Sequence, residues 1–210
     1  MILAEQLVLL ALEPESGAFP RGLDRKRLRL GAAASILAEM ALHKRLARAV
    51  VGGMELSDAM PDFHPLLAEG TALLARVGRA FSADEAISRV ASGISGLEQR
   101  LLDSLNARDI LHDQREAFFI HRYPVRSMQS LREVFAHVHA VESGKNPQPT
   151  ALALAAMVDA SGVLDVRFTP EERFRVRRHL DPAAPGSCVP NPPEDLQLVL
   201  DLAQALAARI

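Results

Sequence analysis

Five basic side chains are concentrated within nine positions near the start of the chain, and their charge suits the binding of an anion. They are Arg21, Arg25, Lys26, Arg27 and Arg29. The segment 21–48 holds eight basic against two acidic residues, whereas the whole chain has a net charge of −2. Cations beside the free amides of a helix start suit a phosphate group. The pattern predicts an anion-binding surface, which Arg45 and Arg48 are expected to adjoin; a solvated loop and helix end is the other interpretation.

A second basic cluster follows a strong helix start at residues 169–172. It consists of Arg173, Arg175, Arg177, Arg178 and His179. Arg175 and Arg178 share one helix face, so part of this helix must be solvated. Cations in a last helical turn complement the helix dipole, and we favour this interpretation over a second anion site.

Glu39 is the one acidic residue within the apolar stretch 30–42. A buried carboxylate needs a partner. We favour a structural ion pair with an arginine, and a contact to a ligand is the alternative.

The sequence lacks the common motifs for metal binding and catalysis. His137 and His139 are two positions apart on an expected helix and point about 200° apart, so they cannot share a metal. There is no HExxH motif, no Cys/His metal spacing, no glycine-rich phosphate loop and no GxSxG. The one cysteine, Cys188, lies in a proline-rich loop with no neighbouring base. We therefore expect no metal, no cofactor and no enzymatic activity.

The composition is typical of a globular protein built from aliphatic helices. Hydrophobic residues make up 49% of the chain and charged residues 24%, and only 4% are aromatic. So few aromatic residues favour packed helices over a β-sandwich. The 210 residues show no repeats and no break in composition, so a single domain over residues 1–210 is expected.

The apolar segments are too short for a membrane protein. The longest apolar run, residues 30–38, has nine residues, whereas a bilayer span needs about 20. No secretory signal precedes residues 7–12, and a single cysteine suits a reducing compartment. We expect a cytoplasmic protein that is not integral to a membrane.

Helical periodicity and capping residues predict most of the chain to be helical. Helices are expected at residues 2–12, 28–51, 66–81, 82–108, 127–142, 150–161, from 170 onward and 194–210. Gly93 and Gly96 weaken one of these segments, which could be two helices. A β-hairpin is expected at 110–123, with its polar turn at 113–116, and the five prolines of 181–193 predict an irregular segment. The expected fold is mainly α: a single domain of seven to eight helices with one short β-hairpin.

Several short motifs follow one another in a recognisable order. LAEQLVLLAL at residues 3–12 is followed by an acidic turn with Gly17, by Gly31, and by ILAEMAL at residues 36–42 before Lys44-Arg45-Leu46. Later come Arg100-Leu101, residues 105–111, Tyr123-Pro124 and Arg175-Val176-Arg177. In this order the chain resembles the Golgi phosphoprotein 3 family over essentially its whole length, and its size is similar to that of the short bacterial members.

The resemblance implies an α-helical domain that is peripheral to membranes. Eukaryotic members of this family bind phosphatidylinositol 4-phosphate and link glycosyltransferase tails to coat proteins. Their headgroup pocket uses a Trp, an Arg and two further basic residues, where an ungapped alignment places Asp24, Ala33, Ser95 and Glu98 of this chain. The basic residues 21–29 occupy the same segment as the family's Trp and Arg. They imply an electrostatic attraction to anionic headgroups of about 1 kcal/mol per surface base.

The function favoured by the sequence is the binding of anionic phospholipid, by resemblance phosphatidylinositol 4-phosphate, through residues 21–29. This interpretation depends on those residues forming one exposed patch. A protein-interaction or adaptor module without lipid binding is the alternative. A winged-helix nucleic-acid binder is less favoured, because the hairpin after helix 87–108 has only Arg115 and Arg122 against Asp113 and Glu116. We expect no nucleic-acid partner.

Overall fold

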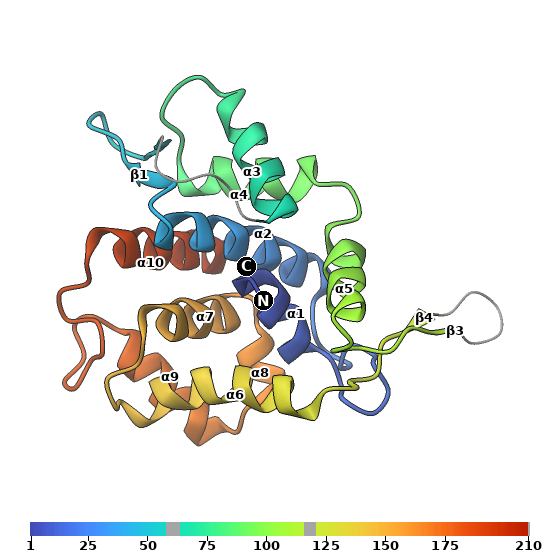
Figure 1. The fold of residues 1–210 in the computed structure, drawn as a ribbon. Coiled ribbons are helices and arrows are strands. Elements are labelled where there is room, and N and C mark those ends of the chain that lie inside the picture. The colour runs from blue at the N-terminus through green and yellow to red at the C-terminus, as the bar shows by residue number, and fades with distance from the viewer. Residues whose placement is uncertain (58–63, 116–120, 210) are drawn as a thin grey trace.

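The computed structural model describes residues 1–57, 64–115 and 121–209, and most of the regular structure in these ranges is helical (Figure 1). The helices are α1 (Leu3–Ala11), α2 (Arg25–Leu42), α3 (Pro65–Ala75), α4 (Ala83–Gly93), α5 (Leu97–Ala107), α6 (Met128–Ser143), α7 (Pro149–Ala160), α8 (Val163–Arg167), α9 (Pro170–Leu180) and α10 (Glu194–Ala207). Two short antiparallel hairpins pair β1 (Leu46–Arg48) with β2 (Met54–Leu56) and β3 (Gln114–Arg115) with β4 (His121–Arg122). The mainly α fold is confirmed, with ten helices and two hairpins in the described residues where seven to eight helices and one hairpin were expected.

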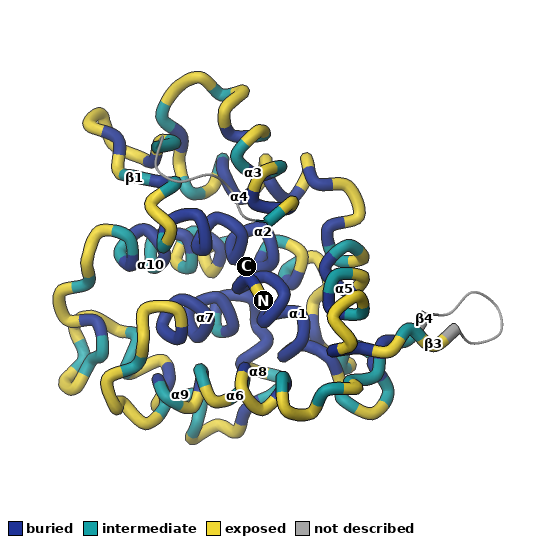
Figure 2. The backbone as a smooth tube through the Cα atoms, viewed as in Figure 1, coloured by how far each residue is buried: buried dark blue, intermediate teal, exposed yellow. Residues whose placement is uncertain are grey.

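α1 lies at the centre of the molecule, and all nine of its residues are buried (Figures 1 and 2). Its sequence, LAEQLVLLA, is apolar on nearly every side, so no face of the helix can be left in water at low cost. α2, α5, α6, α7 and α8 pack around it. α10 covers α2 and α7. The aliphatic interior predicted from the composition is therefore organised around the first helix.

Small residues bring α2 close to its neighbours. Positions 31–34 are Gly or Ala, and all of them are buried. A Cβ atom at Gly31 would lie 2.6 Å from the Cβ of Ser161 and 3.3 Å from a methyl carbon of Leu7. Glycine is therefore required where α2 crosses α1 and the end of α7, and this contact fixes the position of the basic turn at the start of α2.

Glu5 is a completely buried carboxylate at the N-terminus of α1. Its Oε2 accepts a hydrogen bond from the N–H of Ile2 (2.9 Å), and its Oε1 accepts one from Ser104 Oγ (2.6 Å). His64 Nε2 lies 3.3 Å from Oε1, and Arg108 Nη1 lies 3.4 Å from Oε2. Both oxygens therefore have partners, as a carboxylate without water requires.

Glu39 supplies a second carboxylate to the same helix end. Its Oε2 accepts a hydrogen bond from the N–H of Leu3 (2.7 Å), and its Oε1 lies 3.3 Å from Nε2 of His43. The expectation of a structural partner is confirmed, but its identity was wrong. The partners are a backbone amide and a histidine in place of an arginine, because α2 passes directly beside the free amides of α1.

The helix predicted at 28–51 is shorter than expected. It begins at Arg25 and ends at Leu42, and β1 and β2 follow. Lys44 has a φ angle of +57°, which an α-helix cannot contain, and Gly52 and Gly53 with φ angles of +90° and +82° form the turn between the strands. Three-residue strands carry too little alternation to be recognised in a sequence.

Other element boundaries follow from local chemistry. The division at Gly93 and Gly96 is confirmed, since α4 ends at the first and Gly96 precedes α5 with a φ of +60°. The second hairpin lies within 110–123, but residues 114–115 pair with residues 121–122, so the predicted turn at 113–116 is wrong. Part of the second predicted strand, residues 117–120, lies outside the described residues.

The C-terminal half agrees with the capping signals. α9 begins as predicted at a capping box formed by Thr169 and Glu172. α7 begins at Pro149, one residue before the predicted cap, and α8 was not predicted. Residues 181–193 contain no helix or strand, as their prolines predict. None of the helices in the described ranges is long and apolar enough to cross a bilayer.

Replacing Glu5 by Ala is expected to lower the free energy of unfolding by about 2–4 kcal/mol. The change leaves the buried amide of Ile2 and the hydroxyl of Ser104 without their acceptor. Urea denaturation followed by circular dichroism measures it. Glu55→Ala, at an exposed position of β2, is the control and is expected to change stability by less than about 0.5 kcal/mol. Equal effects of the two substitutions would contradict a structural role for the buried carboxylate.

Candidate anion-binding surface at the start of α2

The predicted basic residues lie in and just before the first turns of α2. Asp24 begins the helix, because its Oδ1 accepts hydrogen bonds from the N–H groups of Lys26 (2.8 Å) and Arg27 (3.2 Å). Arg21 lies in the preceding turn. Four of the five side chains are on exposed residues, and Arg27 is half-buried. The helix start therefore presents cations to solvent on several sides.

Three of these cations are held by different neighbours. Arg25 forms an ion pair with Glu98 of α5, and its guanidinium lies 4.2 Å from the centre of the Phe19 ring. Arg29 donates from Nη2 to the carbonyl of Ala91 (2.6 Å) near the end of α4. Arg25 and Arg29 thus both point towards α4 and α5.

Arg27 points to the opposite side of α2. Its Nε donates to the carbonyl of Ala160 (2.9 Å) at the end of α7. Positions two apart on a helix point about 200° apart, which explains the division. Residues 21–29 consequently do not form one continuous patch. Within the described part of the chain, Arg21 and Lys26 are the members of the run whose side chains have no protein partner.

Arg45 and Arg48 lie at the other end of α2. The helix has 18 residues, about 27 Å of length, so the expectation that these two adjoin the basic run is wrong. Arg45 donates from Nη1 to the carbonyl of Ser57 (2.9 Å), and Arg48 pairs with Asp201 of α10 (2.5 Å). Arg45 thus joins the two ends of the first hairpin, and Arg48 ties this hairpin to α10.

The structure adds one cation that the sequence did not indicate. Arg209, directly after α10, lines a hollow of about 120 Å³ together with Lys26 and Arg27. Arg209 is more than 180 residues away from Lys26 and Arg27 in the sequence, so no local spacing relates it to them. The remaining lining residues are Asp24, Leu30 and Leu206.

The basic cluster of α9 is occupied by structural contacts. Arg177 bonds Asp159 (2.7 Å) and Asp165 (2.8 Å), which raise its pKa although burial acts to lower it. Arg175 bonds Glu142 (2.6 Å). The others have similar partners: Arg173 bonds the carbonyl of Asp165, Arg178 that of Pro185, and His179 that of Val141. The cluster therefore ties α9 to α6, α7, α8 and the following loop, a wider role than the predicted complement to the helix dipole.

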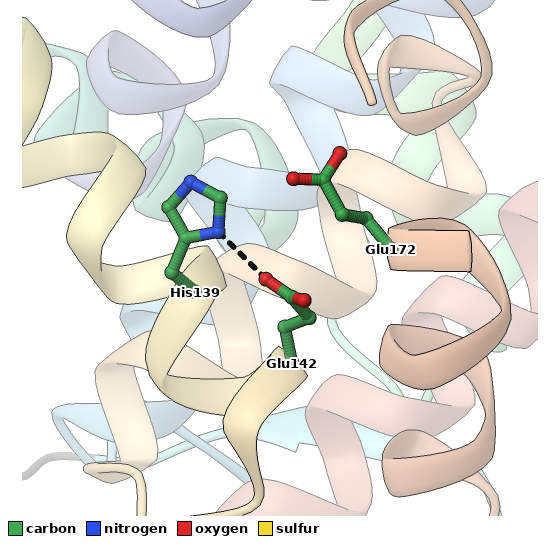
Figure 3. Close-up of side chains that lie close together, drawn as sticks. All are labelled: His139, Glu142 and Glu172. Atoms are coloured by element: carbon green, nitrogen blue, oxygen red, sulfur yellow. Dashed lines mark hydrogen bonds and ion pairs between the residues drawn. The ribbon is translucent and has the colours of Figure 1, made fainter. Parts of the chain in front are cut away.

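His139, Glu142 and Glu172 place three possible metal-ligand atoms within 4.8 Å of one another (Figure 3). Each carboxylate already has partners in the protein. Glu142 accepts from His139 Nδ1 (2.8 Å) and from Arg175, and Glu172 accepts from Thr169 in the capping box. A cation would have to displace these contacts and lie beside the positive charge of Arg175. Glu142, oriented by His139 and bonded to Arg175, works as a hydrogen-bonded clamp between α6 and α9.

The clamp affects the protonation of Glu142. The hydrogen bond from His139 lowers the pKa of Glu142 below its ordinary value of 4.5; burial opposes this effect, and Arg175 reinforces it. Because the folded-state pKa is depressed, the contribution to stability is present above the unfolded value and is lost as the pH falls through the folded value.

The geometry thus defines a helical protein with a buried first helix and a partly unpaired basic surface at one end of its second helix. The family model of Golgi phosphoprotein 3 (GPP34) matches residues 3–196. The chain therefore belongs to the Golgi phosphoprotein 3 family, and the resemblance seen in the sequence is confirmed. No match was found among curated proteins. Arg209 lies beyond the matched segment.

Glu142→Gln is expected to lower the free energy of unfolding by about 1–2 kcal/mol at neutral pH, because the neutral amide pairs weakly with Arg175. The difference from the unchanged protein should shrink as the pH falls below about 4.5, the ordinary value for this carboxyl. Urea denaturation across this pH range measures it. Glu133→Gln, on the exposed face of the same helix, is the control. A difference that stays constant down to about pH 3 would contradict the clamp.

Proposed function

We propose that this protein binds anionic phospholipids at the surface of a membrane, as a cytoplasmic peripheral protein, through Arg21 and Lys26 of the basic run 21–29. The run does not form the single patch that the sequence interpretation required, because Arg25, Arg27 and Arg29 are held on different sides of α2. Membership of the Golgi phosphoprotein 3 family is consistent with such a role. The observation that carries the proposal is the state of Arg21 and Lys26, which are exposed and unpaired within the described structure. The arginines of α9, in contrast, are all bound to acceptors.

The physical basis is electrostatic attraction. A basic side chain close to an anionic membrane contributes about 1 kcal/mol, and at about 0.1 M salt this attraction is largely screened beyond a distance of about 10 Å. Arg25 and Arg29 add positive charge on the adjacent face, although Glu98 neutralises part of it. The protein acts by binding, and the proposal includes no catalytic step, cofactor or metal.

Phosphatidylinositol 4-phosphate is the lipid that we propose for specific recognition, because the family resemblance implies it. The four positions aligned with the family pocket cannot supply the same contacts. Ala33 is buried, and Glu98 carries a negative charge that pairs with Arg25. Any specific contact to the headgroup must therefore use other cations of this surface.

An adaptor function is the second candidate, and one observation favours it. Val50 and Val51, in the turn between β1 and β2, are fully or almost fully exposed. Two adjacent aliphatic side chains in water are suited to contact with another protein. Binding to membranes and binding to a protein partner at this turn would use different ends of α2.

Sedimentation with liposomes tests the lipid proposal. Vesicles containing anionic lipid, with and without phosphatidylinositol 4-phosphate, are compared at about 50 and about 200 mM salt, a range that separates screened from specific binding. We expect binding at low salt that weakens at the higher salt. Arg21→Glu/Lys26→Glu should weaken binding by roughly tenfold or more, since it removes two attractive charges and adds two repulsive ones.

Arg132→Glu/Lys145→Glu is the matched control. It makes the same change in net charge at exposed residues on and after α6, and neither residue has a partner within the described structure. Sedimentation of this variant should stay close to that of the unchanged protein. Failure to sediment with anionic vesicles at low salt, or equal losses in the two variants, would overturn the proposal.

A further inference from the structure

The hollow between α2 and the end of α10 brings three cations together from two distant parts of the chain. Lys26 and Arg27 come from the first turn of α2, and Arg209 comes from the residues that follow α10. We propose that this hollow binds a single phosphate monoester group. The inference deepens the proposed function, because it assigns a location and residues to anion recognition.

The hollow has the size for one small group. Its volume of about 120 Å³ is well below the roughly 300–1,000 Å³ of a pocket that encloses a whole small-molecule ligand. A phosphate would occupy it while the remainder of a larger molecule stays outside. Leu30 and Leu206 form the apolar part of its lining, which reduces solvent screening of the charges.

Arg27 is held in place by its contacts with the core. Its Nε donates to the carbonyl of Ala160, and its guanidinium packs on Gly162, where an added Cβ would lie 3.1 Å from Nη1. The two terminal nitrogens have no acceptor among the described residues. An arginine fixed at Nε, with its Nη atoms unused, is already arranged to donate two hydrogen bonds to an oxyanion.

Arg209 is held in a similar way by α4. Its Nε donates to Oδ1 of Asp84 (2.7 Å), and its Nη2 donates to the carbonyl of Asp84 (2.6 Å) and to Oγ of Ser88 (2.8 Å). Nη1 is the terminal nitrogen without an acceptor in the described structure. Arg209, Arg27 and Lys26, each of which has a donor without an acceptor in the described structure, all line the same hollow.

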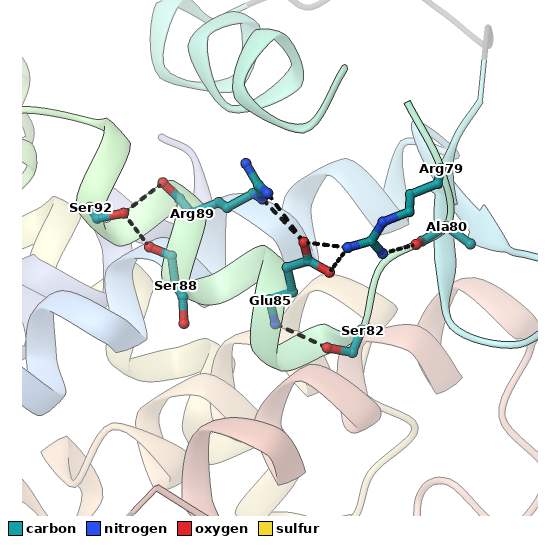
Figure 4. A network of polar contacts seen from close by, with 7 residues as sticks. All are labelled: Arg79, Ala80, Ser82, Glu85, Ser88, Arg89 and Ser92. Atoms are coloured by element: carbon teal, nitrogen blue, oxygen red, sulfur yellow. Dashed lines mark hydrogen bonds and ion pairs between the residues drawn. The ribbon is translucent and has the colours of Figure 1, made fainter. Parts of the chain in front are cut away.

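The turn of α4 that holds Arg209 is itself fixed by a polar network (Figure 4). Ser82 caps the helix by accepting from the N–H of Glu85 (3.1 Å), and the carboxylate of Glu85 binds both Arg79 and Arg89. The carbonyl of Ser88 accepts from Ser92 Oγ (2.7 Å). This support gives Arg209 a defined position, although it lies in the last residues of the described chain.

The charge balance favours an anion. Among the residues that the structure describes, the acidic groups at the hollow are Asp24, whose Oδ1 is used by the first amides of α2, and Asp84, which pairs with Arg209. Three cations against these two carboxylates leave a net positive charge at the positive end of the α2 dipole. Three separate cationic donors suit the three terminal oxygens of a phosphate monoester better than the two oxygens of a carboxylate.

Isothermal titration with inorganic phosphate and with inositol 1,4-bisphosphate, the soluble headgroup of phosphatidylinositol 4-phosphate, tests the site. We expect saturable binding of at least one probe. Lys26→Gln and Arg209→Gln should each weaken it by roughly tenfold or more, since each removes a charge-assisted hydrogen bond. Arg132→Gln, which removes an exposed arginine of α6 that has no partner in the described structure and lies outside the hollow, is the matched control and should bind as the unchanged protein does.

Two further readouts keep the result interpretable. Thermal unfolding of each variant shows whether Arg209→Gln has disturbed the fold, and Lys26→Gln removes a side chain that supports no structural contact. If neither probe binds the unchanged protein, or if the Lys26 and Arg209 variants bind as tightly as the control, the inference is wrong. Binding of both probes with selective loss in these two variants supports it.

Sedimentation of Arg209→Gln with vesicles separates this inference from the proposed function and identifies the source of the phosphate. A loss confined to vesicles that contain phosphatidylinositol 4-phosphate assigns the hollow to a lipid headgroup. Soluble probes that bind here without sedimentation on any vesicle assign the hollow to a free phosphate compound, and the proposed function then fails. Vesicle binding that depends on Arg21 and Lys26 but not on Arg209, with neither soluble probe bound, preserves the proposed function and overturns the inference.

Discussion

The fold depends on supplying hydrogen-bond partners to the N-terminus of a helix that lies entirely inside the protein. The first amides of a helix have no partner within it, and burial removes water as an alternative. Glu5 and Glu39 provide the missing acceptors for Ile2 and Leu3. Because Glu5 also contacts Ser104, His64 and Arg108, the same carboxylate joins α1 to α5 and to the start of α3. Apolar packing alone could place α1 in the centre, but only these groups make its N-terminus stable there.

The position of the basic surface follows from this arrangement. α2 carries Glu39 near its C-terminal end and the cations at its N-terminal end, so holding one end against α1 directs the other towards the surface. Gly31 sets the distance of α2 from α1 and from Ser161. The tight crossing then brings Arg27 within hydrogen-bonding distance of the carbonyl of Ala160. The basic surface is in this sense attached directly to the core and does not belong to a separate loop.

The sequence predicted the features that depend on neighbouring residues, but not the contacts between residues that are distant in the chain. Helical periodicity, capping residues and glycines predicted the mainly α fold class, the division near Gly96 and the start of α9, because each of these features depends on neighbouring residues. The same local pattern could not show that Arg25 meets Glu98 or that Arg209 lies beside Lys26, since those contacts are made only by tertiary packing. It also extended α2 through Lys44, where one left-handed residue ends the helix. A basic run thus predicts the presence of charge at a helix start, but not which cations remain free.

Whether a cation is paired within the protein or free decides whether it can contact a ligand. An arginine that pairs with two carboxylates, such as Arg177 through Nε and Nη2, contributes to stability, and its charge is already balanced within the protein. Arg27 and Arg209 differ, because Arg27 is held by a carbonyl and Arg209 by a single carboxylate together with a carbonyl and a hydroxyl, so their charge is less fully balanced. Lys26 is mobile by comparison and contributes charge without fixed geometry. Two guanidinium groups in fixed positions and one flexible lysine suit two tasks. The lysine attracts anions in general, and the guanidinium groups are placed to orient a single phosphate at the same helix end.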